Sequence, residues 1–348
     1  MAIRSGKLFN FSRLAAIACA GVMLASFTGC NKTGEKSGSD GGNKADLKIG
    51  FIVKQPEEPW FQLEWKFAHK CADKYGFELM KIGAPDGEKA LTAIDTLASS
   101  GAKGFVICTP DVKLGPAIVQ KAKVNNLKLI AVDDRFLGAD GKPMEKVHYL
   151  GISARKIGEN VGEELWKEMQ NRKWPVEETA AGMVTFNELE TARERTGGAK
   201  DALVKAGFPA DKIFEAPQKT TDVPGAFDAV NILLTQHPEV KHWLFFGLND
   251  TAVMGAVRAA EGRQIAAQDT IGIGINGTDA ITEFEKPNPT GFFGSMLLSA
   301  RDHGYKTTEM MYNWITKDEE PPLDTRTVGV FITRDNYKEM LKEQGITE

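Results

Sequence analysis

The sequence predicts an α/β protein with two doubly wound parallel-sheet domains. From Leu47 onward, short runs rich in β-branched and aromatic residues alternate with segments whose apolar residues recur at helical spacing. Repeated strand–helix units of this kind fold into parallel sheets covered by helices on both faces. The runs outnumber the strands of one compact sheet, and 348 residues are enough for two separate cores.

In the first half of the chain, apolar runs predict strands at 48–53, 77–82, 104–108 and 128–133. Helical spacing between them predicts a helix that ends near Gly76 and another that ends at Gly101. In the second half, strands are expected at 181–186, 212–215, 242–246, 270–275 and 291–296, again with helices between them. The strand–helix alternation therefore runs through both halves of the chain.

No linker rich in proline and glycine separates the two halves. We therefore expect the domains to be joined by a hinge of three short crossovers, near Ile152, Leu298 and Thr327. One lobe would comprise residues 47–152 plus 299–327, and the other 153–298 plus 328–348.

The N-terminus has the features of a bacterial export signal. Arg4, Lys7 and Arg13 precede an apolar run at 14–27, which ends directly before Gly29 and Cys30. This ending resembles the lipobox of bacterial lipoproteins, in which the cysteine is lipidated; a plain signal peptide is the alternative. We expect residues 1–29 to be a lipoprotein signal peptide, Cys30 to carry the lipid and 30–46 to form a flexible tether. The expected location is the periplasm or cell surface, anchored to a membrane.

Composition narrows the class of partner. The formal net charge is -4, and loss of residues 1–29 removes three basic and no acidic side chains, which leaves -7. No long basic stripe is present, so we expect no nucleic-acid partner. Beyond the anchor, only Cys71 and Cys108 remain; one disulfide could join them, but free core thiols are the preferred interpretation.

Motifs for catalysis or cofactor binding are weak. The segment 272–277 matches GxGxxG, but its first two glycines fall inside an expected strand, so close packing explains it better. The chain has no GxxxxGK[ST], GxSxG or HExxH motif, and its five histidines are scattered. We therefore expect no catalytic residue, no metal and no cofactor.

Polar residues and aromatic side chains instead gather where the expected strands end. Ligands of open α/β sheets bind beyond these carboxyl ends. The residues of this kind are Lys54, Glu58, Trp60, Phe61, Cys108, Asp133, Asp134, Arg195, Asn249 and Asn276. Carboxylates accept, Lys and Arg donate and Asn does both, which suits the hydroxyl groups of a sugar. Helix capping is an equally good interpretation of Asn249 and Asn276, and a solvated loop position would explain Lys54.

Several segments resemble one family. They are 54–62, 100–111, 131–134, 224–228, 236–244, 272–277 and 312–314, and together they resemble the periplasmic L-arabinose-binding proteins, the sugar-binding components of ABC importers. The resemblance runs from about Leu47 to the C-terminus. It implies the type I periplasmic binding protein fold, with two lobes that close over one sugar.

The resemblance also implies a set of site residues. Asp134 would meet the anomeric hydroxyl, Arg195 the ring-oxygen side, and Trp60 and Phe61 would flank the ring. Further residues that would bind or line the site are Lys54, Glu58, Cys108, Asp133, Ile152, Leu189, Thr191, Leu248, Asn249, Asn276 and Asp279.

The sequence departs from the family at two of the hinge positions. The family has methionine at Ile152 and proline at Leu298. Both positions lie near the far end of the expected sugar, so D-galactose and D-fucose are alternatives to L-arabinose. Isoleucine is stiffer than methionine, and leucine keeps the backbone N–H that proline lacks.

These features predict an extracytoplasmic solute-binding lipoprotein, acting as a monomer and delivering its sugar to the permease and ATPase subunits of an ABC transporter. A ligand-sensing module for a chemoreceptor or sensor kinase is the main alternative. A secreted sugar-converting enzyme ranks below it. A sugar-responsive repressor would need a DNA-binding domain where this chain has its export signal.

Overall fold

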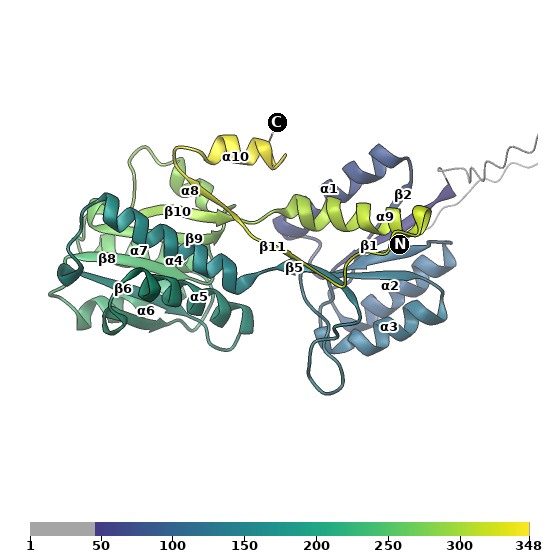
Figure 1. Cartoon of the computed structure of the whole chain (residues 1–348), viewed down its shortest axis with the longest axis horizontal. Coiled ribbons are helices and arrows are strands. Elements are labelled where there is room, and N and C mark those ends of the chain that lie inside the picture. The colour runs from purple at the N-terminus through teal and green to yellow at the C-terminus, as the bar shows by residue number, and fades with distance from the viewer. Residues whose placement is uncertain (1–45, 348) are drawn as a thin grey trace, which may run out of the picture. The chain divides into compact units, whose positions relative to one another are not determined.

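The computed structural model describes residues 46–347 and contains two six-stranded sheets (Figure 1). Both are built mainly from parallel strands with helices on each face, which confirms the predicted fold class. The predicted signal peptide, Cys30 and the tether up to residue 45 lie outside the described residues. Within 46–347, no helix is both long and apolar enough to cross a membrane.

The first sheet is entirely parallel, in the order β11-β5-β4-β3-β1-β2. Its strands are β11 (Asp324–Thr327), β5 (His148–Ile152), β4 (Lys128–Val132), β3 (Gly104–Ile107), β1 (Lys48–Val53) and β2 (Glu78–Gly83). Helices α1 (Pro59–Tyr75) and α9 (Thr307–Lys317) cover one face, and α2 (Gly87–Ser99) and α3 (Gly115–Val124) cover the other.

The second sheet has the order β12-β10-β9-β8-β6-β7 and is parallel except for β12, which pairs antiparallel with β10. Its strands are β12 (Val330–Thr333), β10 (Phe292–Leu297), β9 (Thr270–Asn276), β8 (His242–Gly247), β6 (Thr179–Thr185) and β7 (Ile213–Pro217). One face carries α4 (Ala154–Asn171) and α5 (Glu190–Ala206). The other carries α6 (Val223–Gln236), α7 (Asp250–Gly262), α8 (Ala280–Phe284) and α10 (Tyr337–Glu343).

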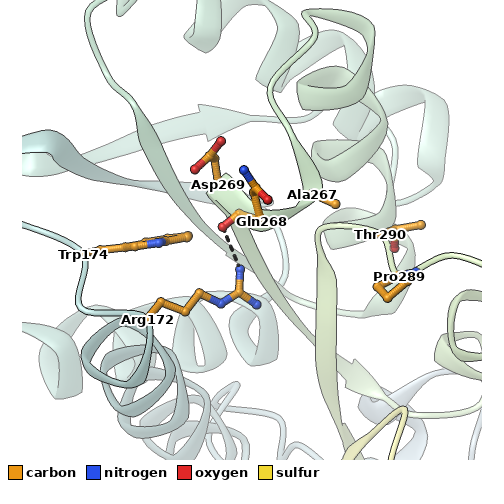
Figure 2. A pocket seen from close by; sticks show the side chains of 7 residues that line it. All are labelled: Arg172, Trp174, Ala267, Gln268, Asp269, Pro289 and Thr290. Atoms are coloured by element: carbon orange, nitrogen blue, oxygen red, sulfur yellow. Dashed lines mark hydrogen bonds between the residues drawn. The ribbon is translucent and has the colours of Figure 1, made fainter.

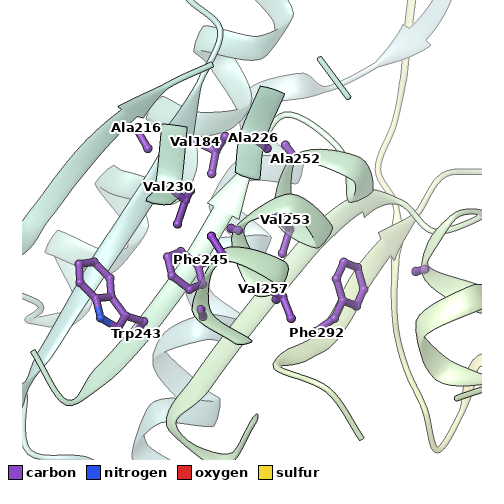
Figure 3. Packing of buried hydrophobic residues seen from close by; sticks show 14 of the residues in the cluster. Val184, Ala216, Ala226, Val230, Trp243, Phe245, Ala252, Val253, Val257 and Phe292 are labelled. Carbon is purple, nitrogen blue, oxygen red and sulfur yellow. The ribbon is translucent and has the colours of Figure 1, made fainter. Parts of the chain in front are cut away.

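The side chains of each strand alternate between two separate hydrophobic cores, one on each face of the sheet. In β8, Trp243 and Phe245 point into the core under α6 and α7 (Figure 3), whereas Leu244 and Phe246 join the core under α4 and α5. A strand alternates its side chains between the two faces of the sheet. Both faces of this sheet are buried, so the sequence of β8 is one continuous apolar run. Runs of this kind allowed the strands to be predicted from the sequence.

The nine expected strands are present within a few residues of their predicted bounds. Strands β5, β11 and β12 were not predicted. Strand β11 reads Asp-Thr-Arg-Thr at the edge of its sheet, with only Thr327 buried, and so carries no apolar run. Strand β12 is also a four-residue edge strand, half exposed. Only pairing with a neighbouring strand identifies such segments.

The chain passes from one sheet to the other after β5, after β10 and after β11. These passages lie beside Ile152, Leu298 and Thr327. They give each sheet strands from distant parts of the sequence. Cys71 and Cys108 are buried free thiols, which agrees with the preferred interpretation of the sequence.

Helices α4 and α5 pack at very close range because glycines face the contact. A Cβ atom on Gly198 of α5 would overlap the backbone carbonyl oxygen of Arg155 on α4. Its neighbour Gly197 points elsewhere, since the nearest atom to a Cβ there would be the Arg155 guanidinium at 3.9 Å. The two adjacent glycines therefore have different roles.

We predict opposite effects of alanine at these two positions. Gly198→Ala should lower the free energy of unfolding by about 1–3 kcal/mol, because the added methyl group forces the helices apart. Gly197→Ala should raise it by roughly 0.5–1 kcal/mol, since alanine favours the helix. Urea denaturation of both variants measures the difference; equal effects would contradict the close packing.

Candidate functional site

A cavity of about 420 Å³ opens at the carboxyl ends of strands from both sheets. Its walls combine polar, charged and aromatic side chains. The residues are Lys54, Gln55, Glu58, Trp60, Phe61, Asp133, Asp134, Ile152, Leu189, Thr191, Arg195, Leu248, Asn249, Asn276, Thr278, Leu298 and His303. Ligands of open α/β sheets bind at this edge, so the cavity lies where the topology places a ligand site.

An ion pair forms one wall of the cavity. The Nζ atom of Lys54, just after β1, lies 2.5 Å from Oδ2 of Asp134, just after β4. The thiol of Cys108, which follows β3, lies 3.6 Å from the same oxygen. Strands β1, β3 and β4 are neighbours in the sheet, and this adjacency brings the three side chains together. Burial lowers the pKa of Lys54, but the acidic groups Cys108, Asp134 and Asp133 outweigh it and raise that pKa, so the amine stays charged.

Asp133 is held in a strained conformation beside the ion pair. Its φ of 62° lies in the left-handed region, and its backbone carbonyl accepts a 2.7 Å hydrogen bond from the Tyr149 hydroxyl. Its Oδ1 lies 2.6 Å from Nδ1 of His303. Burial would raise the pKa of Asp133, but its hydrogen bond and electrostatic interaction with His303 lower that pKa overall. This carboxylate is therefore ionised and fixed in place.

Aromatic side chains from α1 form a second wall. Phe61 is buried, and its ring centre lies 6.0 Å from Nζ of Lys54. Trp60 packs edge-on against His303, with 5.3 Å between ring centres. Trp60 also contacts the apolar cores of both sheets. An aromatic surface of this kind suits the apolar C–H face of a sugar ring.

The half of the chain that holds the second sheet contributes a partly buried guanidinium. Arg195, on α5, donates a 2.5 Å hydrogen bond to the carbonyl oxygen of Leu248. Its Nε is buried and has no hydrogen-bond partner among the described residues. Burial lowers the pKa of Arg195 to about 10, partly opposed by Asp250 and Glu194, so the side chain remains a cation at neutral pH. It therefore offers an unused donor beside the cavity.

The two asparagines that end strands of this sheet differ. Asn249 caps α7: its Oδ1 accepts from the backbone N–H of Ala252 at 2.9 Å, so the capping interpretation is confirmed. Its amide nitrogen is 3.4 Å from the carbonyl oxygen of Thr221. Asn276 caps no helix; its φ is 116°, and its side chain has no hydrogen bond among residues 46–347. Asn249 lines the cavity as well as capping, and Asn276 has its amide free for a ligand.

The buried side chain of Asp250 stabilises the strained turn at Asn276 through hydrogen bonds. The buried carboxylate of Asp250 accepts hydrogen bonds from Gly277 N at 2.8 Å, Ala280 N at 3.2 Å and the Ser295 hydroxyl at 2.5 Å. Burial raises the pKa of Asp250 to about 7, although the Ser295 hydrogen bond opposes the shift. The carboxylate thus holds the loop that carries Asn276.

The structure brings most of the predicted site residues together. Cys108 contacts Asp134 but is fully buried and does not line the cavity, and Asp279 is exposed and lies outside it. Gln55, Thr278 and His303 line the cavity but were not predicted. Gln55 and Thr278 are close in sequence to Lys54 and Asn276, which could have indicated them. No sequence signal indicated His303, because it reaches the cavity from a distant segment.

A second hollow lies at the opposite, amino-terminal edge of the second sheet (Figure 2). It is lined by Arg172, Trp174, Ala267, Gln268, Asp269, Pro289 and Thr290. The Arg172 guanidinium is already engaged there, since it donates to the carbonyl oxygens of Gln268 at 3.2 Å and Thr270 at 3.0 Å. The carboxylate of Asp269 lines this hollow, and its Oδ1 atom lies 3.2 Å from Nδ1 of His242.

The fold and cavity define a two-lobed α/β binding protein. Residues 46–340 match the family model described as periplasmic binding proteins and sugar binding domain of LacI family, and the chain belongs to this family. It is 59% identical over 302 residues to the L-arabinose-binding periplasmic protein of Escherichia coli, covering 86% of this chain and 92% of that protein.

Other relatives give a consistent picture. An ABC transporter L-arabinose-binding periplasmic protein of Azospirillum brasilense is 48% identical over 312 residues, 89% of this chain and 93% of its own. Among solved structures, a periplasmic ribose ABC transporter protein from Conexibacter woesei superposes with a TM-score of 0.72 at 15% identity, covering 87% of this chain and 97% of that one. An arabinose binding protein from Geobacillus stearothermophilus gives 0.67 at 15% identity, with 84% and 99% covered. These structural matches show the same fold.

We predict that Asp250→Ala lowers the free energy of unfolding by about 2–4 kcal/mol, because it leaves three buried donors without an acceptor. The control is Asp279→Ala, whose exposed side chain caps no helix and should change stability by less than about 0.5 kcal/mol. Urea denaturation at pH 8, where Asp250 is ionised, measures both. A loss below 1 kcal/mol for Asp250→Ala would show that the carboxylate does not support the turn.

Proposed function

We propose that the chain captures a monosaccharide, L-arabinose in the first place, and delivers it to an ABC-type sugar permease. The main support for this proposal is the cavity of about 420 Å³, which is lined by charged donors, carboxylates and aromatic rings from the parts of the chain that hold the two sheets. The two curated relatives named for L-arabinose support the choice of sugar.

Each side of the cavity would bind a different part of the sugar. Lys54, Asp133 and Asp134 from the first sheet would pair with one set of hydroxyl groups, and Arg195, Asn249 and Asn276 from the second with another. Trp60 and Phe61 would flank the ring. Carboxylates accept, cations donate and amides do both, so each hydroxyl finds both kinds of partner. Glu58, Ile152, Leu189, Thr191 and Leu248 complete the proposed lining.

Closure would follow from the three passages between the sheets. We propose that residues 47–152 plus 299–327 and 153–298 plus 328–348 act as two lobes, with Ile152, Leu298 and Thr327 as hinge positions. A sugar that contacts both lobes binds the closed state more tightly and shifts the population towards it. The permease would then recognise the closed state. Cys30 would carry a lipid that holds the protein at the membrane, with 30–46 as its tether.

The hinge positions also bear on which sugar is preferred. Ile152 is half-buried and packs against the second core, and the backbone N–H of Leu298 donates a 3.1 Å hydrogen bond to the carbonyl oxygen of Asn276. Proline at position 298 could not donate this bond. A stiff Ile152 would leave less room than a flexible side chain for a substituent beyond the pentose ring, which would favour L-arabinose over D-galactose and D-fucose.

We predict that Arg195→Ala and Asp134→Ala each weaken L-arabinose binding by at least 10-fold, because each removes a charged hydrogen-bond partner with a contribution of about 1.5–3 kcal/mol. The matched control is Arg193→Ala, an exposed arginine on the same helix. Isothermal titration calorimetry measures the affinity, and circular dichroism checks the fold. An unchanged affinity in both test variants would refute the site, and no response of the wild-type protein to any of the three sugars would refute the sugar.

We predict that Ile152→Met improves binding of D-galactose relative to L-arabinose by about 10-fold, because a flexible side chain yields to an extra exocyclic carbon. The ratio of the two dissociation constants in one variant is independent of its stability. Leu150→Met, a buried position in the same strand that does not line the cavity, is the control. A ratio equal to that of the wild type would show that Ile152 does not set the preference.

A further inference from the structure

A buried carboxyl group stands behind the cavity without a hydrogen-bond donor. Glu64, on α1, has a side chain that is 0% exposed, and neither of its oxygens has a hydrogen-bond partner within residues 46–347. The Oδ2 atom of Asp133 is buried and lacks a donor in the same part of the chain. His303 Nδ1 lies 2.6 Å from Asp133 Oδ1 but 3.8 Å from Glu64 Oε1, so the imidazole is hydrogen-bonded to Asp133 and not to Glu64.

Two buried carboxylates facing one another would be strongly unfavourable, because each is desolvated and carries the same charge. A single proton removes the conflict. A protonated carboxyl group gains one O–H donor, which can pair with the neighbouring carboxylate. One proton on Glu64 therefore pairs one of its two oxygens with Asp133 Oδ2, and only its carbonyl oxygen stays without a partner in this part of the chain.

A metal ion is the competing explanation, since Glu64, Asp133 and His303 offer ligand atoms that all lie within 4.8 Å of one another. Both ring nitrogens of His303 are already engaged, however: Nδ1 with Asp133 and Nε2 with the Thr327 hydroxyl at 3.0 Å. A metal ion would have to break one of these hydrogen bonds. A proton requires no such change.

The charged and titratable groups around Glu64 favour the neutral acid. Asp133 and Asp134 after β4, Cys108 after β3 and His303 on the π-helix η6 (Asp302–Lys306) face it from neighbouring elements. Lys54, after β1, forms its ion pair with Asp134. Burial, followed by the negative charge of Asp133, raises the pKa of Glu64 well above its usual value, although the Trp60 side chain opposes the shift. Gly304 lets η6 pack directly against α1 at this residue, since a Cβ on Gly304 would overlap the Glu64 backbone carbonyl.

We propose that Glu64 remains a neutral carboxylic acid and donates a hydrogen bond to Asp133 Oδ2, which makes it a positioning residue for the ligand site. Its effect on sugar affinity rests on the function proposed above, whereas its protonation state does not. Asp133 is thereby held from two sides, by Glu64 of α1 and by His303 of η6. Because His303 also contacts Thr327 at the end of β11, the same contacts tie the cavity to one of the passages between the sheets.

The test compares Glu64→Gln, which keeps an N–H donor at every pH, with Glu64→Met, which keeps the volume but removes the donor. Lys66→Met, at an exposed position on the same helix, is the control. In calorimetry at pH 7, we expect L-arabinose affinity within about threefold of wild type for Glu64→Gln and at least 10-fold weaker for Glu64→Met. Loss of one buried hydrogen-bond donor has an effect of this size.

Two readouts report the proton directly. The infrared spectrum of the wild type should contain the carbonyl band of a protonated carboxylic acid that Glu64→Gln lacks. Unfolding releases the proton above the ordinary glutamate pKa of 4.5, so stability should fall as pH rises towards the raised folded-state pKa. Between pH 5.5 and 7.5, the unfolding constant of the wild type should therefore rise about tenfold per pH unit relative to Glu64→Gln.

Absence of the infrared band together with a flat stability ratio would overturn the proposal. A divalent cation that stabilises the wild type but not Glu64→Gln would overturn it in favour of a metal site. Equal affinities of Glu64→Met and wild type would overturn the positioning role. If the wild type binds none of the three sugars, the proposed function and the positioning role both fall, while the band and the pH dependence still decide whether the acid is neutral.

Discussion

The hydrogen bond between Asp133 and His303 is the contact on which the arrangement of the cavity depends. Asp133 follows the central part of the first sheet, and His303 comes from η6, 170 residues further along the chain. At 2.6 Å, this bond fixes a carboxylate whose backbone adopts a strained left-handed conformation. Through Thr327, His303 links the same carboxylate to β11, the last strand before the chain returns to the second sheet. The ligand site and the connection between the sheets therefore share one buried polar network.

The two sides of the cavity differ in how their charged side chains are paired. On the first sheet, the carboxylates of Asp133 and Asp134 each have a side-chain partner within hydrogen-bonding distance, His303 and Lys54 respectively. On the second, Arg195 has a single close partner, a backbone carbonyl, and keeps an unused buried donor. Unpaired buried donors are unfavourable. A hydroxylated ligand would satisfy this donor, so the second side is incomplete without one.

Much of the fold was predictable because both faces of each sheet are buried. Strands such as β1 and β8 are continuous apolar runs, and the helices between them have apolar residues at regular spacing. Edge strands β11 and β12 lack this signal, since their side chains are largely exposed and their pairing involves residues distant in the sequence. The candidate site was predictable where polar residues follow strands directly, as at Lys54, Asp134 and Asn276. The resemblance to a known family supplied Ile152, Leu189 and Leu248, which are apolar, and Thr191, which does not directly follow a strand.

The sequence by itself determined the strand–helix alternation, the position of the polar residues at strand ends and the family of the chain. All of these depend on local order along the chain. Only the tertiary structure decided that His303 joins Asp133, that Glu64 is buried behind it and that Cys108 and Asp279 stand outside the cavity. The physical reason is that contacts between distant segments are set by how the sheets and helices pack. Burial and hydrogen bonding, which give these side chains their protonation and roles, exist only after that packing has formed.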